Sequence, residues 1–317
     1  MRGVARAPGT CGELIQGTIN GVNFHVTCPV DMYSVVEVML RPGQKRVTVS
    51  PQYGKVAEAV VRTMVLSGIE GYDAEVLVHS QLPVGKGMAS STADITAACV
   101  ATAEALGVFI PPEDISGLAL AIEPSDGIMY SGLVLFDHVA GKLYRGLEEP
   151  PPIKLLVIDP GGFIDTGEFN ARTSLPKLNR QKENTIRQAL KLMEEGLTAG
   201  DPYKIGLAAT MSAIANQQTI FKPDLENIIN IARGFGAFGV NAAHSGTVIG
   251  ILYDDNRTDI EALTKELIAY NKAFQLIGCS LTGGGAEIPV TERGKTEWEP
   301  YNTSMAATSG QRQQSMG

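Results

Sequence analysis

The sequence is poor in the residues that build disulfide or metal frameworks. It holds four cysteines and four histidines among 317 residues. The cysteines stand far apart, with no Cys-x-x-Cys spacing, and the histidines are scattered along the chain. A disulfide scaffold or a structural zinc site would need closely spaced ligand pairs. The pattern therefore argues against both and favours a reducing compartment.

A long apolar run and a basic surplus are absent as well. No window reaches the roughly 18 apolar residues of a membrane span, and the segment Met1–Pro8 has no signal-peptide hydrophobic region. The 26 Lys and Arg residues against 34 Asp and Glu residues give a formal net charge of −8. This charge argues against nucleic acid or an anionic membrane as the main partner. We therefore expect a cytoplasmic protein that binds neither, and the sequence leaves a homodimer open.

Apolar residues and glycine are well represented. Hydrophobic residues make up 44% and charged residues 19% of the chain, a balance typical of globular domains that excludes a wholly disordered chain. The 35 glycines exceed the average share of about 7%. Because they show no collagen period, we expect them at turns and at places where two backbones approach closely.

Three consecutive prolines mark the best candidate for a domain boundary. Pro150–Pro152 cannot continue a helix or a central strand. On both sides, apolar residues at helical spacing alternate with short β-rich runs, which predicts helices near residues 56–67, 91–106, 112–122, 182–197, 203–217, 224–233 and 258–271. We therefore expect two α+β halves, residues 1–150 and 151–292. A polar tail at residues 293–317 is expected to be disordered.

A glycine-rich segment, PVGKGMASSTA at residues 83–93, lies between a predicted strand and a long apolar helix. Gly85 and Gly87 allow the backbone to turn its amides inward, and the Ser and Thr residues that follow open the helix. Free amides together with the helix dipole form an anion site. The candidate phosphate-binding residues are Pro83, Val84, Gly85, Lys86, Gly87, Met88, Ala89, Ser90, Ser91 and Thr92. The alternative is a capped helix after a tight turn, and the spacing of a Walker loop is absent.

A second glycine string, Gly234–Gly239, matches the pattern G-x-G-x-x-G. It follows a predicted helix and precedes a predicted strand, which reverses the order found in dinucleotide-binding folds. We interpret it as a helix end and a turn rather than as the NAD site of an oxidoreductase.

The segment at residues 83–93 resembles the phosphate-binding motif P-x-x-x-G-L-G-S-S-A of the GHMP small-molecule kinases, with Met88 and Ala89 in place of Leu-Gly. Residues 7–14, APGTCGEL, resemble that family's P-G-x-x-x-G-E segment on the substrate side. Residues 236–247, GAFGVNAAHSGT, resemble its third motif, which ends in S-G-x-G in the family and keeps one of those glycines here. The three segments stand in the family's order.

The resemblance implies both a fold and an activity. The fold is the two-domain α+β architecture of the GHMP kinases, with an N-terminal half like ribosomal protein S5 domain 2 and a ferredoxin-like C-terminal half. The opening PGTCGELIQG at residues 8–17, with NFHVTCPVD at residues 23–31, looks most like the kinases that phosphorylate free L-threonine for the aminopropanol arm of cobalamin and in propanediol utilisation. The alternatives are a homoserine kinase, another small-alcohol kinase of the family, or a non-catalytic ligand-binding protein with the same fold.

The same resemblance implies ATP and Mg²⁺ as cofactors and names residues for the chemistry. Ser91 and Glu123 are the implied Mg²⁺ ligands, in keeping with the preference of this ion for few protein oxygens. Glu123 stands at the end of a predicted helix, where the dipole opposes a negative charge, so its placement favours a functional carboxylate over a solvated one. Asp126 is a candidate for the general base or for shaping the substrate pocket, with a plain Asp-Gly turn as the alternative.

The amino-acid head of such a substrate needs partners for its carboxylate and its ammonium group. Residues 166–176, TGEFNARTSLP, resemble a homoserine-kinase segment and point to Arg172, because the planar guanidinium fork suits a carboxylate. Further candidates around the substrate are Glu13, Asp31, Ser245 and Gly246. His244, inside the third motif, is interpreted as a packing residue.

Overall fold

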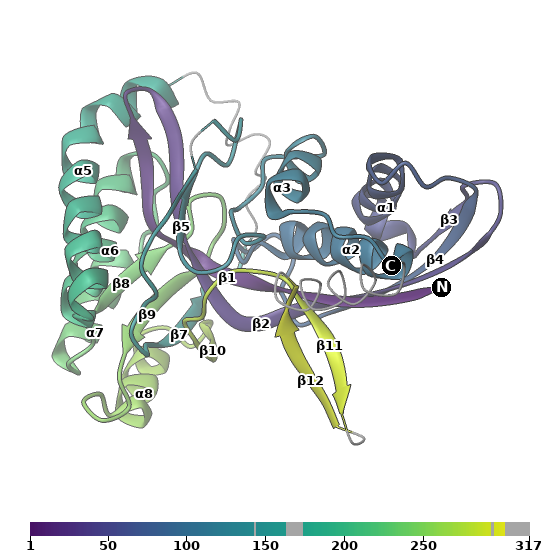
Figure 1. Cartoon of the computed structure of the whole chain (residues 1–317). Coiled ribbons are helices and arrows are strands. Elements are labelled where there is room, and N and C mark those ends of the chain that lie inside the picture. Colours follow the sequence, from purple (N-terminus) through teal and green to yellow (C-terminus); the bar gives the residue numbers. More distant parts are fainter. Residues whose placement is uncertain (143, 163–173, 293–294, 302–317) are drawn as a thin grey trace.

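The computed structural model describes residues 1–142, 144–162, 174–292 and 295–301. A long β-hairpin, β1 (Arg2–Ile19) and β2 (Val22–Pro42), runs through the centre of the molecule (Figure 1). The strands turn at Asn20 and Gly21, whose φ angles are +52° and +79°. Two positive φ angles in succession give a tight turn whose twist matches that of the strands. From Ser34 to Leu40 every second residue of β2 is buried, the period of a strand with one face on the core.

The N-terminal half of the sheet extends this hairpin. Beyond β2 lie β4 (Tyr72–Ser80) and then β3 (Val47–Thr48), while the short pair β5 (Val134–Phe136) and β6 (Tyr144–Gly146) adds to the other part of β2. Helix α2 (Ser90–Leu106) packs on β1 and β2 and is buried on nearly all sides, as a run of alanine and β-branched residues predicts. Its neighbours are η1 (Pro51–Tyr53), α1 (Gly54–Leu66) and α3 (Pro112–Leu120).

The C-terminal half adds four antiparallel strands in the order β10-β7-β9-β8. Numbered along the chain this order is 4-1-3-2, which confirms the ferredoxin-like arrangement that was expected. The strands are β7 (Lys154–Asp159), β8 (Gly239–Ala242), β9 (Ile249–Tyr253) and β10 (Gln275–Ser280). The helices are α5 (Leu175–Ala199), α6 (Pro202–Ala215), η2 (Asn216–Gln218), α7 (Leu225–Gly234) and α8 (Ile260–Tyr270).

One continuous sheet joins the two halves. Strand β8 pairs with β1 at Glu13 and Ala242, so the long hairpin belongs to both halves at once. Separate apolar clusters lie under α1 and α2, under α5 and α6, and between α7, α8 and the C-terminal strands. The division of the chain at residue 150 stays a prediction, because the sheet itself does not break there.

The C-terminal tail is shorter than expected. Strands β11 (Glu287–Glu292) and β12 (Lys295–Pro300) form a hairpin, and β11 also pairs with β1 (Figure 1). Tyr301 is buried, and its hydroxyl accepts a hydrogen bond of 2.9 Å from the amide of Ile110. The expectation of disorder from residue 293 is therefore wrong for residues 295–301, because an aromatic anchor fastens them to the core. The rest of the tail lies outside the described residues.

The predicted helices are found, with small changes at their ends. The largest difference is α5, which begins at Leu175, seven residues earlier than the apolar spacing predicted, because its first turns carry charged and polar side chains. Gly234–Gly239 ends α7 and leads into β8, as interpreted from the sequence. Across the described residues, every helix is too short or too polar to cross a membrane.

Candidate functional site

The glycine-rich loop connects β4 to α2 and has the geometry of an anion site. Gly85 and Gly87 have φ angles of +73° and +84°, and Ala89 takes a left-handed conformation at +52° immediately before the helix. No described side chain caps the first turn of α2. The amides at this helix end therefore face a position where the dipole favours a negative group.

Backbone hydrogen bonds hold the loop from two sides. From β1, the amides of Thr10 and Gly12 donate to the carbonyls of Met88 and Gly87, both at 3.0 Å. From the turn between β8 and β9, the amides of Thr247 and Val248 donate to the carbonyl of Lys86 at 3.0 and 3.1 Å. The three segments that resemble family motifs thus meet at one point, with the phosphate loop between the other two.

Lys86 takes part in the loop through its backbone, and its side chain turns elsewhere. The ammonium lies 2.9 Å from Oδ2 of Asp159 at the end of β7, and it also donates to the carbonyl of Gly162 at 2.9 Å. Thr247 donates to the other oxygen of Asp159. The Lys86 ammonium is thus paired with a buried carboxylate, and the part of Lys86 in phosphate binding stays a prediction.

Ser91 and Glu123 come together as expected. The Ser91 hydroxyl, in the first turn of α2, donates to Oε1 of Glu123, and the ammonium of Lys55 on α1 lies 2.5 Å from Oε2. A hydroxyl and a carboxylate side by side next to the loop form an oxygen donor set of the kind that Mg²⁺ accepts from proteins. Lys55 was not singled out in the sequence, where it is an ordinary lysine at the start of a helix.

Glu13 forms the centre of a second, buried polar cluster. It is 5% exposed, and its two oxygens face the backbone amide of His244 at 2.8 Å and the ring Nδ1 of His244 at 3.0 Å. Nδ1 of His25 lies 3.9 Å from Glu13 and 3.6 Å from Oδ1 of Asp126. We call Glu13, His25 and Asp126 the cradle. Burial and the negative charge of Glu13 raise the pKa of Asp126 to about 7.

Three histidines from three separate segments pack together at the cradle: His25, which is part of it, and His138 and His244. The rings of His25 on β2 and His138 after β5 stack with centroids 3.6 Å apart, and His244 meets His25 edge-on at 4.1 Å. Burial lowers the pKa of His25 and His138 well below the usual value, so both rings are neutral. Their buried Nδ1 atoms have no hydrogen-bond partner among the described residues. The ligand atoms of His25, His138 and His244 lie within 4.8 Å of one another, close enough to hold a metal ion or the polar group of a ligand.

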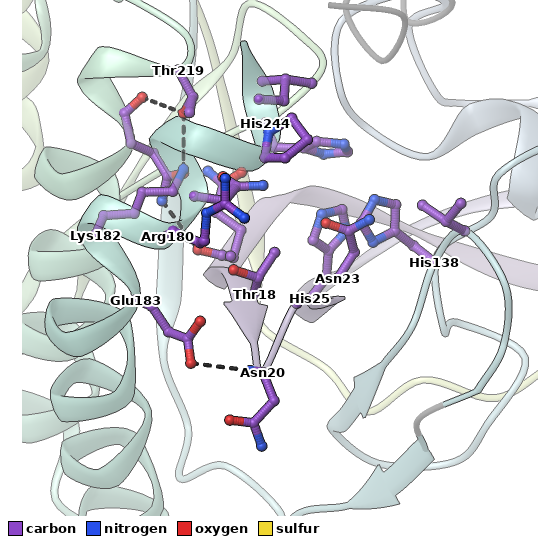
Figure 2. Close-up of a pocket in the computed structure, with 18 of the residues that line it drawn as sticks. Thr18, Asn20, Asn23, His25, His138, Arg180, Lys182, Glu183, Thr219 and His244 are labelled. Atoms are coloured by element: carbon purple, nitrogen blue, oxygen red, sulfur yellow. Dashed lines mark hydrogen bonds between the residues drawn. The ribbon is translucent and has the colours of Figure 1, made fainter. Parts of the chain in front are cut away.

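A cavity of about 780 Å³ opens beside these histidines. The tip of the β1–β2 hairpin, the chain after β5 and the first turns of α5 line it. Figure 2 shows Lys182 and Arg180 on the α5 side and the rings of His25 and His138 on the other side. Lys182 donates to Oδ1 of Asn216 and, at 3.0 Å, to the hydroxyl of Thr219. The cavity therefore has a cationic wall and a wall of neutral rings backed by carboxylates.

The remaining predicted substrate residues lie elsewhere. Asp31 is exposed, its carboxylate accepts a 2.6 Å hydrogen bond from the amide of Ser280, and it does not line the cavity, so its role at the substrate stays a prediction. Gly246 lies against the phosphate loop, and its carbonyl accepts a hydrogen bond from Lys222 at 2.6 Å. Neither Ser245 nor Gly246 lines the cavity, and their role at the substrate stays a prediction. Arg172 lies outside the described residues.

Sequence reasoning missed His25, His138 and Lys182 as site residues. They are 113 and 44 positions apart along the chain, and no local pattern connects them. A single histidine in an apolar strand is more often a packing residue than a ligand. His244 was interpreted that way, whereas its contact with Glu13 makes it part of the site.

Two family models match stretches of the chain, and two relatives match most of it. The family model of the GHMP kinases N terminal domain matches residues 53–133, and that of the GHMP kinases C terminal domain matches residues 191–273. An L-threonine kinase of Salmonella typhimurium is 38% identical over 264 residues, which is 83% of this chain and 87% of that protein. An L-threonine kinase of Citrobacter freundii is 33% identical over 287 residues, which is 89% of this chain and 98% of that protein.

Solved structures share the fold at lower identity. The homoserine kinase of Cytophaga hutchinsonii superimposes with a TM-score of 0.67 at 20% identity, over 90% of this chain and 97% of that one. The mevalonate diphosphate decarboxylase of Staphylococcus aureus reaches a TM-score of 0.70 at 15% identity, over 90% and 97% of the two chains. At these identities the likeness concerns the fold alone.

Proposed function

The chain belongs to the GHMP kinase family, and we propose that it transfers the γ-phosphoryl group of ATP to the side-chain hydroxyl of free L-threonine, giving O-phospho-L-threonine. The observation that carries the choice of substrate is the likeness to two L-threonine kinases along most of the chain. A polar cavity lined by His244, two residues before the glycine that packs on the phosphate loop, is large enough for an amino acid and supports it.

The phosphate loop and the Ser91–Glu123 pair form the ATP side of the site. Amides of the loop and of the first turn of α2 hold the phosphates, with no basic surplus needed. Ser91 and Glu123 are the residues that would hold Mg²⁺, which neutralises phosphate charge when bound. The Lys55 ammonium, which is ion-paired with Glu123, adds a positive charge next to these two residues.

On the acceptor side, we place Asp126 at the reacting hydroxyl. Its amide donates to the Thr92 hydroxyl at the start of α2 at 3.4 Å, so Asp126 connects the rest of the cradle to the helix that follows the phosphate loop. The threonine oxygen attacks the γ-phosphorus, the bond from that phosphorus to the bridging oxygen breaks, and ADP leaves. The hydroxyl proton passes to the Asp126 carboxylate. A raised pKa suits this role, because a base is most effective near the operating pH.

We assign the binding of the threonine ammonium group to Glu13 and His25. In threonine the ammonium and the hydroxyl are on adjacent carbons. A threonine bound in the cradle therefore presents its hydroxyl to Asp126 and its ammonium to the neighbouring Glu13 and His25. Glu13 supplies a buried negative charge and His25 an unpaired ring nitrogen. A cation that donates hydrogen bonds satisfies both.

The wider setting is proposed on the same resemblance. We infer that the product enters the aminopropanol arm of cobalamin, and that the enzyme works in the cytoplasm on small molecules, without nucleic acid or membrane. A homodimer is the oligomer that we would look for first.

Product analysis tests the function directly. The full chain is incubated with ATP, Mg²⁺ and L-threonine, and ³¹P NMR follows the reaction. A phosphomonoester signal coupled to the threonine β-proton should grow in step with ADP. ADP formation with inorganic phosphate as the only other product would contradict the proposal.

A further inference from the structure

Lys182 is a partly buried cation that forms no ion pair with the described residues. Its two hydrogen-bond acceptors, Asn216 and Thr219, are neutral, and no described carboxylate lies within ion-pair distance. The neighbouring Glu183 also lines the cavity, but its carboxylate accepts from the amide of Asn20 and pairs with the guanidinium of Arg187 instead. Burial lowers the pKa of Lys182 to about 8, which reflects the cost of holding an uncompensated charge there. An anionic ligand bound at Lys182 would offset that cost.

The lysine faces the cradle across the cavity. Both Lys182 and His25 line it, and the positive charge of Lys182 contributes to the lowered pKa of His25. Figure 2 shows the two side chains on opposite sides. Among the described residues the cavity is therefore polarised. One wall carries Lys182, which has no ion pair there, beside Glu183, which is already paired, and Glu13 and Asp126 lie behind the other wall. A second buried lysine, Lys222, interacts electrostatically with Glu13 and does not line the cavity.

A zwitterion matches this polarity. We propose that Lys182 binds the carboxylate of the acceptor, opposite the Glu13–His25–Asp126 cradle, so that the site selects free α-amino acids over alcohols that lack a carboxylate. The inference rests on the proposed function and adds the residue that selects the substrate class. It assigns to α5 the role that the sequence gave to Arg172.

Substitution of Lys182 combined with an altered acceptor tests this. L-Threonine is compared with L-threonine amide, which keeps the ammonium and the hydroxyl and lacks the negative charge. Lys182→Met keeps most of the aliphatic stem of the side chain and removes the ammonium. We expect kcat/KM for L-threonine to fall at least about tenfold, the scale of losing a charge-assisted contact. The value for the amide and the KM for ATP should change by less than about twofold, which also shows that the variant is folded.

Two further variants sharpen the comparison. Lys182→Arg restores the charge and should recover part of the preference for L-threonine over its amide. Lys191→Met, at an exposed position of the same helix, should leave both acceptors unaffected. An equal loss for both acceptors in Lys182→Met, or no loss, would overturn the role of Lys182 and leave the kinase assignment standing. Wild-type enzyme that phosphorylates neither acceptor would overturn the proposed function, and the role of Lys182 with it.

Discussion

Gly246 and Gly87 meet backbone to backbone. A Cβ atom added to Gly246 would lie 2.2 Å from the amide nitrogen of Gly87 and 2.2 Å from the carbonyl oxygen of Lys86. No side chain fits in that space, so the turn after β8 and the phosphate loop act as one unit. This contact explains why a glycine is required in a segment that belongs to the other half of the chain.

Gly246→Ala should therefore damage ATP binding. The methyl group must push the turn away from the loop, at a cost of about 1–3 kcal/mol in unfolding free energy. We expect KM for ATP to rise about tenfold or more, which corresponds to about 1.4 kcal/mol. Gly117→Ala is the matched control, because nothing lies within 4 Å of the added atom in α3. A normal KM for ATP in Gly246→Ala would show that the loop does not depend on this contact.

Glu123→Ala should separate catalysis from stability. Glu123 contacts Ser91 and Lys55 and is partly exposed, with 21% of its side chain accessible. We expect kcat to fall by at least ~10²-fold, the scale of a lost electrostatic contact in the transition state. Thermal unfolding should change little, because partly exposed ion pairs contribute about 0–1 kcal/mol. Glu261→Ala, exposed on α8, serves as the control. Near-wild-type turnover would remove Glu123 from the metal and phosphate site.

Asp126 should make stability depend on pH in an unusual direction. Its pKa in the folded protein is about 7, against 3.8 for the free side chain, so the folded state holds a proton that the unfolded state releases. Stability contributed by this group is thus full below about pH 4 and is lost as pH rises through about 7.

The variant Asp126→Asn removes that dependence. By this linkage it should be more stable than wild type at pH 8.5 by roughly 1–4 kcal/mol, and the gain should be much smaller at pH 5. Urea unfolding at both pH values measures the difference, with Asp255→Asn at an exposed turn as control. An equal gain in unfolding free energy at both pH values would mean that burial beside Glu13 does not raise the pKa of the Asp126 carboxyl.

Tyr301 should contribute to stability although it stands close to the end of the chain. It is 4% exposed and packs in the core under α2, and its hydroxyl accepts a hydrogen bond from the amide of Ile110. We expect Tyr301→Ala to cost about 3–5 kcal/mol, as for other buried aromatic residues. Tyr301→Phe should cost about 1 kcal/mol, because only the hydroxyl's hydrogen bonds with the Ile110 amide and the Val108 carbonyl are lost. Chemical denaturation measures both, and two unchanged midpoints would contradict the burial.

The parts of the site that could be predicted from sequence are local. Gly85, Gly87 and Ser91 form a short pattern whose physical meaning, a turn with inward amides before a helix, can be read without any fold. The likeness to a known family then ordered the three motif segments. The strand order of the C-terminal half also agreed with that likeness.

The parts that could not be predicted depend on contacts between distant segments. His25, His138 and Lys182 belong to β2, a loop after β5, and α5, and only the folded hairpin brings them to one cavity. Asp31 was a reasonable candidate beside the first motif, and the register of β2 places it at the Ser280 amide. The sequence could not show which lysine has no ion pair among the described residues, because ion pairing depends on the fold.

The central claim is the choice of acceptor. The most direct measurement is kcat/KM for ADP release with L-threonine, L-homoserine, L-serine and mevalonate, at saturating ATP and Mg²⁺. The account predicts that L-threonine is preferred over each of the others by at least about tenfold, since one pocket contact is worth about 1–3 kcal/mol. A higher kcat/KM for L-homoserine than for L-threonine would contradict it, as would tight ATP binding with no ADP released for any alcohol.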